Sequence, residues 1–113
     1  MTSSDWLLAA LPAAQTRDWR NVEVPHIVHD SRRVGPGDLF VAVTGVAVDG
    51  HRYVPDALRA GAGVFVVERW LPELEGVPTA IVPNAREALA WLHAAALGYP
   101  ARALRVIGVT GTD

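Results

Sequence analysis

The residues that most suggest chemistry stand at the end of the sequence, where an apolar run at 104–109 continues into Thr110-Gly111-Thr112-Asp113. Phosphate-binding loops begin in this way, because glycines let backbone N–H groups turn inward around phosphate oxygens. Such loops also need a Lys and a Ser or Thr at the head of a helix, and that half is absent from these 113 residues. The pattern alone leaves two interpretations, the first part of a phosphate loop or an ordinary turn after a strand.

A second polar group is His29-Asp30-Ser31-Arg32, which holds the residue types of a hydrolase triad. Neighbouring side chains on an extended segment point to opposite faces, so these residues cannot converge on one substrate atom as a triad does. Two interpretations remain. Asp30 or Ser31 is bonded to its own backbone, or the group forms a polar mouth at the carboxyl end of a strand, where open α/β sheets bind ligands.

A third candidate is the segment Thr44-Gly45-Val46-Ala47-Val48-Asp49-Gly50-His51. Its small and apolar side chains leave the backbone accessible, so a flat heterocycle such as uracil could pack there and be read by main-chain groups. The plainer interpretation is a connection in which Asp49 caps the following helix, and we expect that cap in either case.

The composition narrows the function. The net charge is −2 and the ten basic residues, all Arg, are scattered, which argues against a nucleic-acid surface. There is no Cys, and His26 and His29 fall on opposite faces of an expected strand, so no metal site is predicted. The absence of a long apolar run or a signal-peptide pattern leads us to expect a cytoplasmic protein without a membrane partner.

The elements that must position these groups follow from periodicity and turn residues. The order strand, helix, strand predicts parallel pairing through a crossover, and hence an α/β fold with a small, mostly parallel or mixed sheet and flanking helices. The expected elements are a helix over 5–11 capped by Ser4, an irregular stretch over 13–23, an edge strand over 24–29, a turn over 34–38, strands over 39–43, 64–67, 79–82 and 104–109, and helices over 51–60 and from Asn84 to about 97.

Taken together and in order, these segments resemble the Mur ligase family, ATP-dependent enzymes that build the peptidoglycan stem peptide. The resemblance covers about residues 24–68 and 104–113 well. The matching residues are Asp30-Ser31-Arg32, Pro36-Gly37-Asp38-Leu39-Phe40-Val41-Ala42, Gly45, Asp49-Gly50-His51, Ala57 through Gly61 with the next Val-rich strand, and Gly108-Val109-Thr110-Gly111-Thr112-Asp113.

The resemblance implies two parts and a set of roles. Residues 1–83 would form a domain that binds the uridine nucleotide of the substrate, and residues 84–113 would begin the central ATP-binding domain with its first helix and strand. His29 and Ser31 would touch the uridine diphosphate, and Val46, Ala47 and Val48 would line the base pocket. Gly111, Thr112 and Asp113 would open the ATP loop. His29, the apolar loop residues and Asp113 differ from common choices in the family.

The implied whole enzyme uses ATP and Mg²⁺ to add the third amino acid to UDP-N-acetylmuramoyl-L-alanyl-D-glutamate. We expect this chain, as an N-terminal piece, to be a monomer that binds substrate, holds no bound cofactor of its own and lacks the catalytic residues. Two alternatives stay open. One is the branch of the family that adds D-alanyl-D-alanine, and the other is a non-catalytic α/β interaction module.

Overall fold

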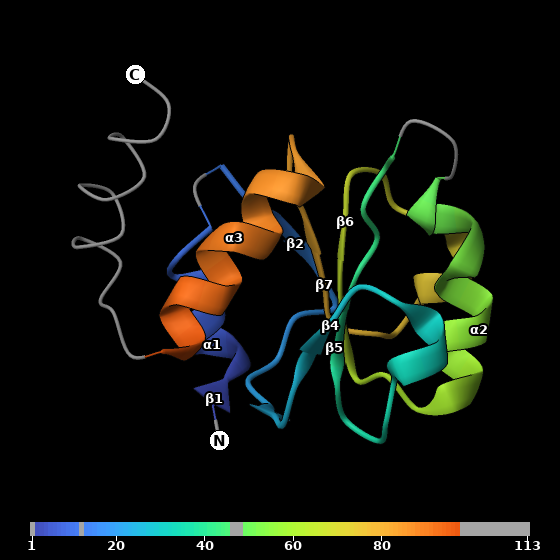
Figure 1. Ribbon diagram of the computed structural model, residues 1–113, viewed down its shortest axis with the longest axis horizontal. Coiled ribbons are helices and arrows are strands. Elements are labelled where there is room, and N and C mark those ends of the chain that lie inside the picture. Colours follow the sequence, from blue (N-terminus) through green and yellow to red (C-terminus); the bar gives the residue numbers. More distant parts are fainter. Residues whose placement is uncertain (1, 12, 46–48, 98–113) are drawn as a thin grey trace.

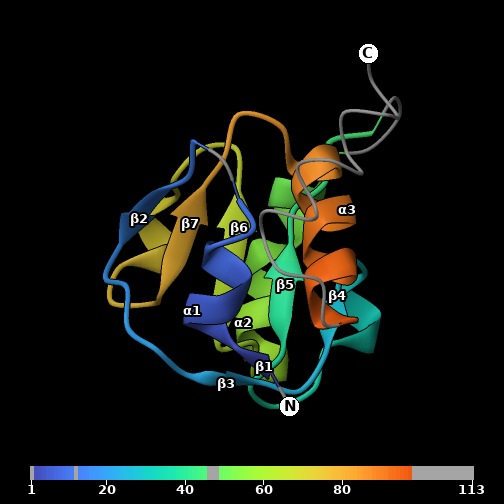
Figure 2. The same ribbon diagram turned by 90° about the vertical axis from the view of Figure 1, so that its left-hand side faces the viewer.

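A five-stranded sheet forms the centre of the molecule, with the strand order β2-β7-β6-β5-β4 (Figure 2). The computed structural model describes residues 2–11, 13–45 and 49–97. Four neighbouring strands run parallel and β2 joins the edge antiparallel to β7. The strands are β2 (Gln15–Arg17), β4 (Ile27–Val28), β5 (Leu39–Val41), β6 (Val64–Val67) and β7 (Thr79–Ile81). A separate antiparallel pair joins β1 (Thr2–Ser3) to β3 (Glu23–Val24).

Helices cover both faces of this sheet, so the molecule has three layers (Figure 1). On one face lie α1 (Ser4–Leu8) and α3 (Ala85–Ala96), and on the other lies α2 (Val54–Ala60). The connections also contain three short 3-10 turns, η1 (Ser31–Arg33), η2 (Gly50–Tyr53) and η3 (Pro72–Leu74). This arrangement confirms the predicted α/β class with a small mixed sheet. Of the described helices, none has both the length and the apolarity that a membrane span requires.

The alternation of side chains along β5 and β6 divides the interior into two cores. Leu39, Val41 and Val64 face α1 and α3, while Phe40 and Phe65 face α2. The two phenylalanine rings meet edge to face, with centroids 5.9 Å apart, an arrangement that aromatic pairs favour. Because both faces are covered, these strands are apolar at consecutive positions, as is usual for parallel strands.

The predicted turns and helix ends around α2 are confirmed. Gly61 ends α2 with φ of 105°, a left-handed conformation that glycine adopts without strain. Gly37 has φ of 82° in the turn before β5, and its N–H donates to the carbonyl of Gly61 at 2.8 Å. The chain thus passes from β5 through α2 to a parallel β6, as the strand–helix–strand order predicted.

The start of the chain differs from the prediction that Ser4 caps a helix over 5–11. Ser3 is the cap, since its side chain accepts from the N–H of Trp6, and the α-helix ends at Leu8. Ser4 is fully buried, and its hydroxyl accepts from the N–H of Val22 and donates to the carbonyl of Arg20. A tertiary contact with 20–22 therefore takes the hydroxyl that local sequence assigned to capping.

The stretch over 13–23 was predicted to be irregular, and this was wrong for β2. All three residues of β2 are exposed, so no apolar periodicity marks the strand. Its backbone pairs with β7, and the guanidinium of Arg17 lies 3.9 Å from the ring centre of Trp70. The strand forms because β7 offers an unpaired edge, a partner that lies some sixty residues away and leaves no local signal.

The predicted helix after Asn84 is confirmed as α3, with the Asn84 side chain accepting from the N–H of Glu87 at 3.0 Å. Its buried side recurs at helical spacing and packs in the same core as β5, β6 and β7; the residues are Ala85, Ala88, Leu92 and Ala95. The predicted division after residue 83 stays a prediction. The predicted strand at 104–109 lies outside the described residues.

Gly50 offers a test of the close approach between η2 and the end of β5. A Cβ added at Gly50 would lie 2.6 Å from the carbonyl oxygen of Val43 and 2.7 Å from its nitrogen, so backbone would have to move. We expect Gly50→Ala to lower the free energy of unfolding by roughly 2 kcal/mol or more in urea titrations. Gly35→Ala is the matched control, because its Cβ would meet only the Asp38 carboxylate at 3.5 Å. Equal stabilities of the two variants would contradict the close approach.

Candidate functional site

Polar residues follow each of the parallel strands at the same edge of the sheet. His29 follows β4, Thr44 stands three residues after β5, Glu68 follows β6, and Asn84 precedes α3 after β7. Because these four strands run in the same direction, their carboxyl ends share one edge. Open α/β sheets bind ligands outside this edge, so the topology gathers the candidate residues where a site is expected.

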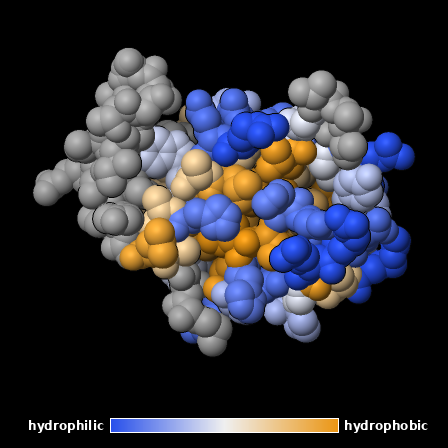
Figure 3. All heavy atoms as spheres, viewed as in Figure 1, coloured by the Kyte–Doolittle hydropathy of each residue, from blue (hydrophilic) through white to orange (hydrophobic). Residues whose placement is uncertain are grey.

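An open hollow of about 590 Å³ lies between η1 and the start of α2. It is lined by His29, Asp30, Ser31, Arg32, Tyr53 and Asp56. The structure thus brings the two predicted diphosphate residues, His29 and Ser31, to one surface. Hydrophilic side chains cover much of the α2 side of the molecule in Figure 3.

Asp30 builds the local frame of this hollow. Its carboxylate accepts from the backbone N–H of Arg32 at 3.0 Å and so caps η1. The same carboxylate receives Nε and Nη2 of the Arg32 guanidinium at 3.0 and 2.9 Å. The side-chain hydrogen bond from Arg32, followed by the backbone bond, lowers the pKa of Asp30 to about 2. The interpretation in which Asp30 bonds its own backbone is therefore confirmed.

Ser31 and His29 line the same hollow as Asp30. Ser31 is half-buried at the first position of η1, and within the described part of the chain its hydroxyl has no hydrogen-bond partner. His29 is exposed at the end of β4 and also lines a second hollow of about 430 Å³ with Arg33 and His93. A hydroxyl donor with nearby Arg and His side chains suits an anionic group such as a diphosphate.

The other predicted site residues are outside the part of the chain that the structure describes. Val46, Ala47 and Val48, expected to line the base pocket, and Gly111, Thr112 and Asp113, expected to open the ATP loop, lie outside the described residues. Two residues on either side of 46–48 are described, Thr44 and Asp49, and they form an isolated antiparallel bridge.

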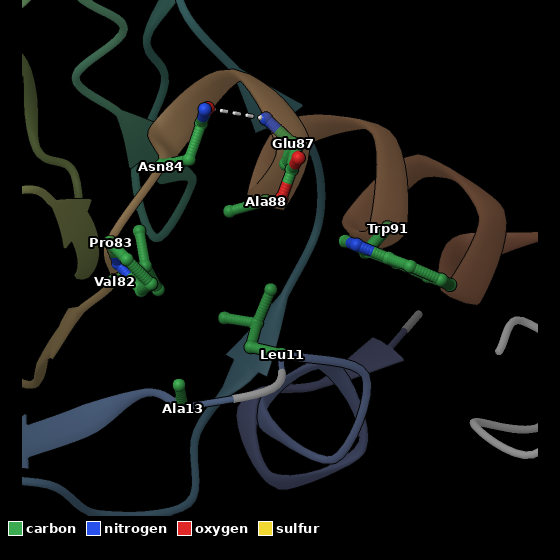
Figure 4. Close-up of a pocket in the computed structure, with 8 residues that line it drawn as sticks. All are labelled: Leu11, Ala13, Val82, Pro83, Asn84, Glu87, Ala88 and Trp91. Carbon is green, nitrogen blue, oxygen red and sulfur yellow. Dashed lines mark hydrogen bonds between the residues drawn. The ribbon is translucent and has the colours of Figure 1, made fainter. Parts of the chain in front are cut away.

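A smaller apolar hollow of about 110 Å³ lies at the start of α3 (Figure 4). It is lined by Leu11, Ala13, Val82, Pro83, Asn84, Glu87, Ala88 and Trp91. None of the predicted site residues lines it, and the polar groups drawn there are Asn84 and Glu87, which are joined by the capping hydrogen bond. This hollow therefore belongs to the packing of α3 and not to the candidate site.

Sequence reasoning missed a hydrogen-bond network that starts at Asp49. The predicted cap is confirmed, because the Asp49 carboxylate accepts from the N–H of His51 at 3.0 Å. The same oxygen lies 2.7 Å from Nδ1 of His51, and the Arg69 guanidinium reaches the other oxygen at 2.8 Å. The backbone bond from His51, then the Arg69 and His51 side chains, hold the pKa of Asp49 well below its usual range.

His51 is buried, with 2% of its surface exposed, and both ring nitrogens are used. Nε2 lies 2.9 Å from the backbone nitrogen of Glu68, which can only donate, so Nε2 is the acceptor. Nδ1 then carries the proton and donates to Asp49. The sequence analysis placed His51 at the start of a helix and among the residues that match the family, but did not predict that its ring is buried and bonded. The available signal was Asp49-Gly50-His51 together with an acidic residue directly after a buried strand.

The described residues give no support for a metal site. Within residues 2–11, 13–45 and 49–97, no group of three His, Asp or Glu side chains is placed to hold an ion. His26 instead lies 3.3 Å from the buried carboxylate of Asp38, which also accepts from the N–H of Gly35.

The comparison with known proteins matches this architecture. The profile described as "Mur ligase family, catalytic domain" matches residues 23–96, about two thirds of the chain. The chain belongs to the Mur ligase family. The matched region contains the residues of the η1 hollow, the Asp49 network and α3.

Individual relatives agree with this family. The chain is 52% identical over 96 residues to a UDP-N-acetylmuramyl-tripeptide synthetase of Roseiflexus, covering 82% of this chain and 18% of the relative. It is also similar to a solved UDP-N-acetylmuramoylalanyl-D-glutamyl-2,6-diaminopimelate–D-alanyl-D-alanyl ligase of Acinetobacter baumannii, with TM-score 0.72, 27% identity, and coverage of 82% and 21%. A MurF ligase of Thermotoga maritima in complex with ADP matches with TM-score 0.52 and 36% identity over 59% of this chain and 15% of that one. The chain spans about a fifth of the length of these proteins.

The low pKa of Asp49 predicts a pH-dependent contribution to stability. A carboxyl group whose pKa is lowered by folding stabilises the native state above its unfolded pKa of 3.8 and loses this effect as the pH falls through the folded value. We expect Asp49→Asn to be less stable than the unsubstituted protein at pH 7, and the difference to shrink below about pH 4. Urea unfolding between pH 3 and 7 measures it, with Glu73→Gln, an exposed carboxylate, as control. A difference that stays constant across this range would contradict the ionic role of Asp49.

Proposed function

We propose that this chain is the uridine-nucleotide-binding part of an ATP-dependent ligase that adds the third amino acid to UDP-N-acetylmuramoyl-L-alanyl-D-glutamate. The observation that carries the proposal is the 52% identity over 96 residues to a protein named UDP-N-acetylmuramyl-tripeptide synthetase. The substrate is a water-soluble nucleotide sugar, and we place the enzyme, as a monomer, in the cytoplasm.

The proposed contact with the diphosphate is made by Ser31 and His29. Ser31 presents a hydroxyl at the first position of η1, and His29 stands between two open hollows at the end of β4. Arg32 is already paired with Asp30, whereas Arg33 is exposed beside the second hollow. The uracil base would lie against Val46, Ala47 and Val48, whose two flanks, Thr44 and Asp49, are bridged at the same edge.

The proposed reaction begins when the γ-phosphoryl group of ATP passes to the substrate carboxylate, with release of ADP. The amino group of the incoming amino acid then attacks the acyl phosphate, forming the amide and releasing phosphate. ATP and Mg²⁺ supply the leaving group and the charge stabilisation for these steps. Gly111, Thr112 and Asp113 are proposed to open the ATP loop, but the described residues hold no donor set for Mg²⁺.

These 113 residues contain no Lys, so the lysine that clamps phosphates in such loops is not among them. We therefore propose that the chain by itself binds the substrate and forms no amide. We propose that residues 1–83 form the substrate-binding part and that residues 84–113 begin the ATP-binding part.

The rival proposal is the ligase that adds D-alanyl-D-alanine. It is supported by the fold similarity to the Acinetobacter baumannii ligase, at TM-score 0.72 and 27% identity. The higher identity to the tripeptide synthetase favours the first proposal. The two are distinguished by assaying the complete protein with ATP and each acceptor. Extension of the UDP-muramoyl dipeptide by one amino acid supports the first, and extension of the tripeptide by D-alanyl-D-alanine supports the second.

Ser31 provides the test of the proposed site. We expect Ser31→Ala to weaken binding of UDP-N-acetylmuramoyl-L-alanyl-D-glutamate to this chain about tenfold, because a hydrogen bond to a charged group contributes roughly 1.5–3 kcal/mol. Isothermal titration calorimetry and amide chemical shifts measure the affinity. The matched control is Thr16→Ala on β2, the outer strand on the far side of the sheet from β4.

Two outcomes would count against the site. Equal affinities of Ser31→Ala and Thr16→Ala would remove Ser31 from the contact. The absence of heat and of shift changes at millimolar ligand with the unsubstituted chain would contradict substrate binding and favour the alternative of a non-catalytic interaction module.

A further inference from the structure

Glu68 makes hydrogen bonds to three separate segments of the chain. Its Oε1 accepts from the hydroxyl of Thr44 at 3.3 Å, and its Oε2 accepts from the N–H of Ala85 at 2.8 Å. Its own N–H donates to Nε2 of His51 at 2.9 Å. One half-buried residue at the end of β6 is therefore bonded to the segment after β5, to η2 and to the first residue of α3.

The bonds to Thr44 and His51 reach both flanks of one segment. Thr44 is its first residue, and Asp49, held by the His51 ring at 2.7 Å, is near its end. Thr44 and Asp49 are themselves paired in the isolated bridge. A change in the position of Thr44 acts on Glu68 directly, and a change in the position of Asp49 acts on it through the buried His51.

The bond to Ala85 meets the first turn of α3. The N–H groups of a first helical turn lack partners within the helix. Here the Asn84 side chain accepts from the N–H of Glu87, and the Glu68 carboxylate accepts from the N–H of Ala85. The carboxylate also lies where the helix dipole favours negative charge. Ala85 is fully buried. If the Glu68 carboxylate moves away, water can therefore reach the N–H of Ala85 only if the start of α3 rearranges.

We propose that Glu68 is a positioning residue that couples Thr44 and the Asp49–His51 pair to the first turn of α3. Ligand binding beside these residues, at the carboxyl ends of the parallel strands, and the placement of α3 then depend on each other through one carboxylate. The coupling rests on the proposed function only for the identity of the ligand, the UDP-N-acetylmuramoyl dipeptide. A role confined to stability would leave Thr44 and Ala85 independent.

The first test needs no ligand and follows the amide of Ala85 by hydrogen exchange in the ¹⁵N-labelled chain. We expect Thr44→Val to raise the exchange rate at Ala85 at least about twofold relative to Thr44→Ser, which keeps the hydroxyl, since groups in one hydrogen-bond network are energetically coupled. Glu68→Ala should raise the rate further, and Glu68→Gln, whose amide can keep both contacts, should stay near the unsubstituted value. Equal rates in Thr44→Val and Thr44→Ser would overturn the coupling.

The second test measures affinity for UDP-N-acetylmuramoyl-L-alanyl-D-glutamate by calorimetry. We expect Glu68→Ala to weaken binding about tenfold, and Glu68→Gln to restore it to within about threefold. Glu75→Ala is the control, because Glu75 is an exposed carboxylate in the connection that follows β6. If Glu68→Ala binds as tightly as Glu75→Ala, the link to the ligand is refuted.

The two tests separate failure of this inference from failure of the proposed function. If the unsubstituted chain binds no dipeptide, the binding proposal fails, and the exchange rates at Ala85 still decide whether Thr44 and α3 are coupled. If Glu68→Ala does not fold, as judged by thermal unfolding, the Thr44→Val and Thr44→Ser pair carries both measurements.

Discussion

The parallel pairing of β5 and β6, covered on both faces, is the constraint on which the rest of the structure depends. Leu39 pairs with Val64 and Phe40 with Phe65, and each successive side chain enters the core on the opposite side of the sheet. A parallel pair needs a crossover, which α2 supplies, and needs cover on both faces, which α1 and α3 complete. Because β4, β5 and β6 run in the same direction, His29, Thr44 and Glu68 all lie at the carboxyl ends of the strands.

The carboxyl ends of these strands carry buried polar groups, and each buried group needs a hydrogen-bond partner. His51 would destabilise the fold if either ring nitrogen lacked a partner. Asp49 and the backbone of Glu68 provide both partners, and Arg69 binds the remaining carboxylate oxygen of Asp49. The hollow beside η1 is different, because several of its polar side chains, those of His29, Arg32 and Asp56, are exposed. A rigid frame next to an open polar hollow is the arrangement expected of a ligand-binding edge.

Several elements could be predicted because their signals are local. Asn84 accepts from Glu87 three residues on, Asp49 caps η2, and Gly61 ends α2 with a left-handed conformation. The apolar runs of β5 and β6 marked buried strands without further information. The pairing of His29 with Ser31 in one hollow also followed from their place after a strand. The structure adds that the Asp30 carboxylate is bonded to Arg32, whereas the Ser31 hydroxyl has no hydrogen-bond partner among the described residues.

The sequence by itself determined the α/β class, because helix caps, glycine turns and apolar periods act within a few residues, and the order of its motifs indicated the family. Only the tertiary structure decided what depends on distant partners. These are the pairing of β2 with β7 and the hydrogen bonds of the Ser4 hydroxyl to the 20–22 segment. They also include the packing of α3 against β5, β6 and β7, and the hydrogen bonds of Glu68 to Thr44, His51 and Ala85. The physical reason is that a hydrogen-bond donor or an unpaired strand edge accepts any partner that the fold brings within reach, and local sequence carries no record of which one arrives.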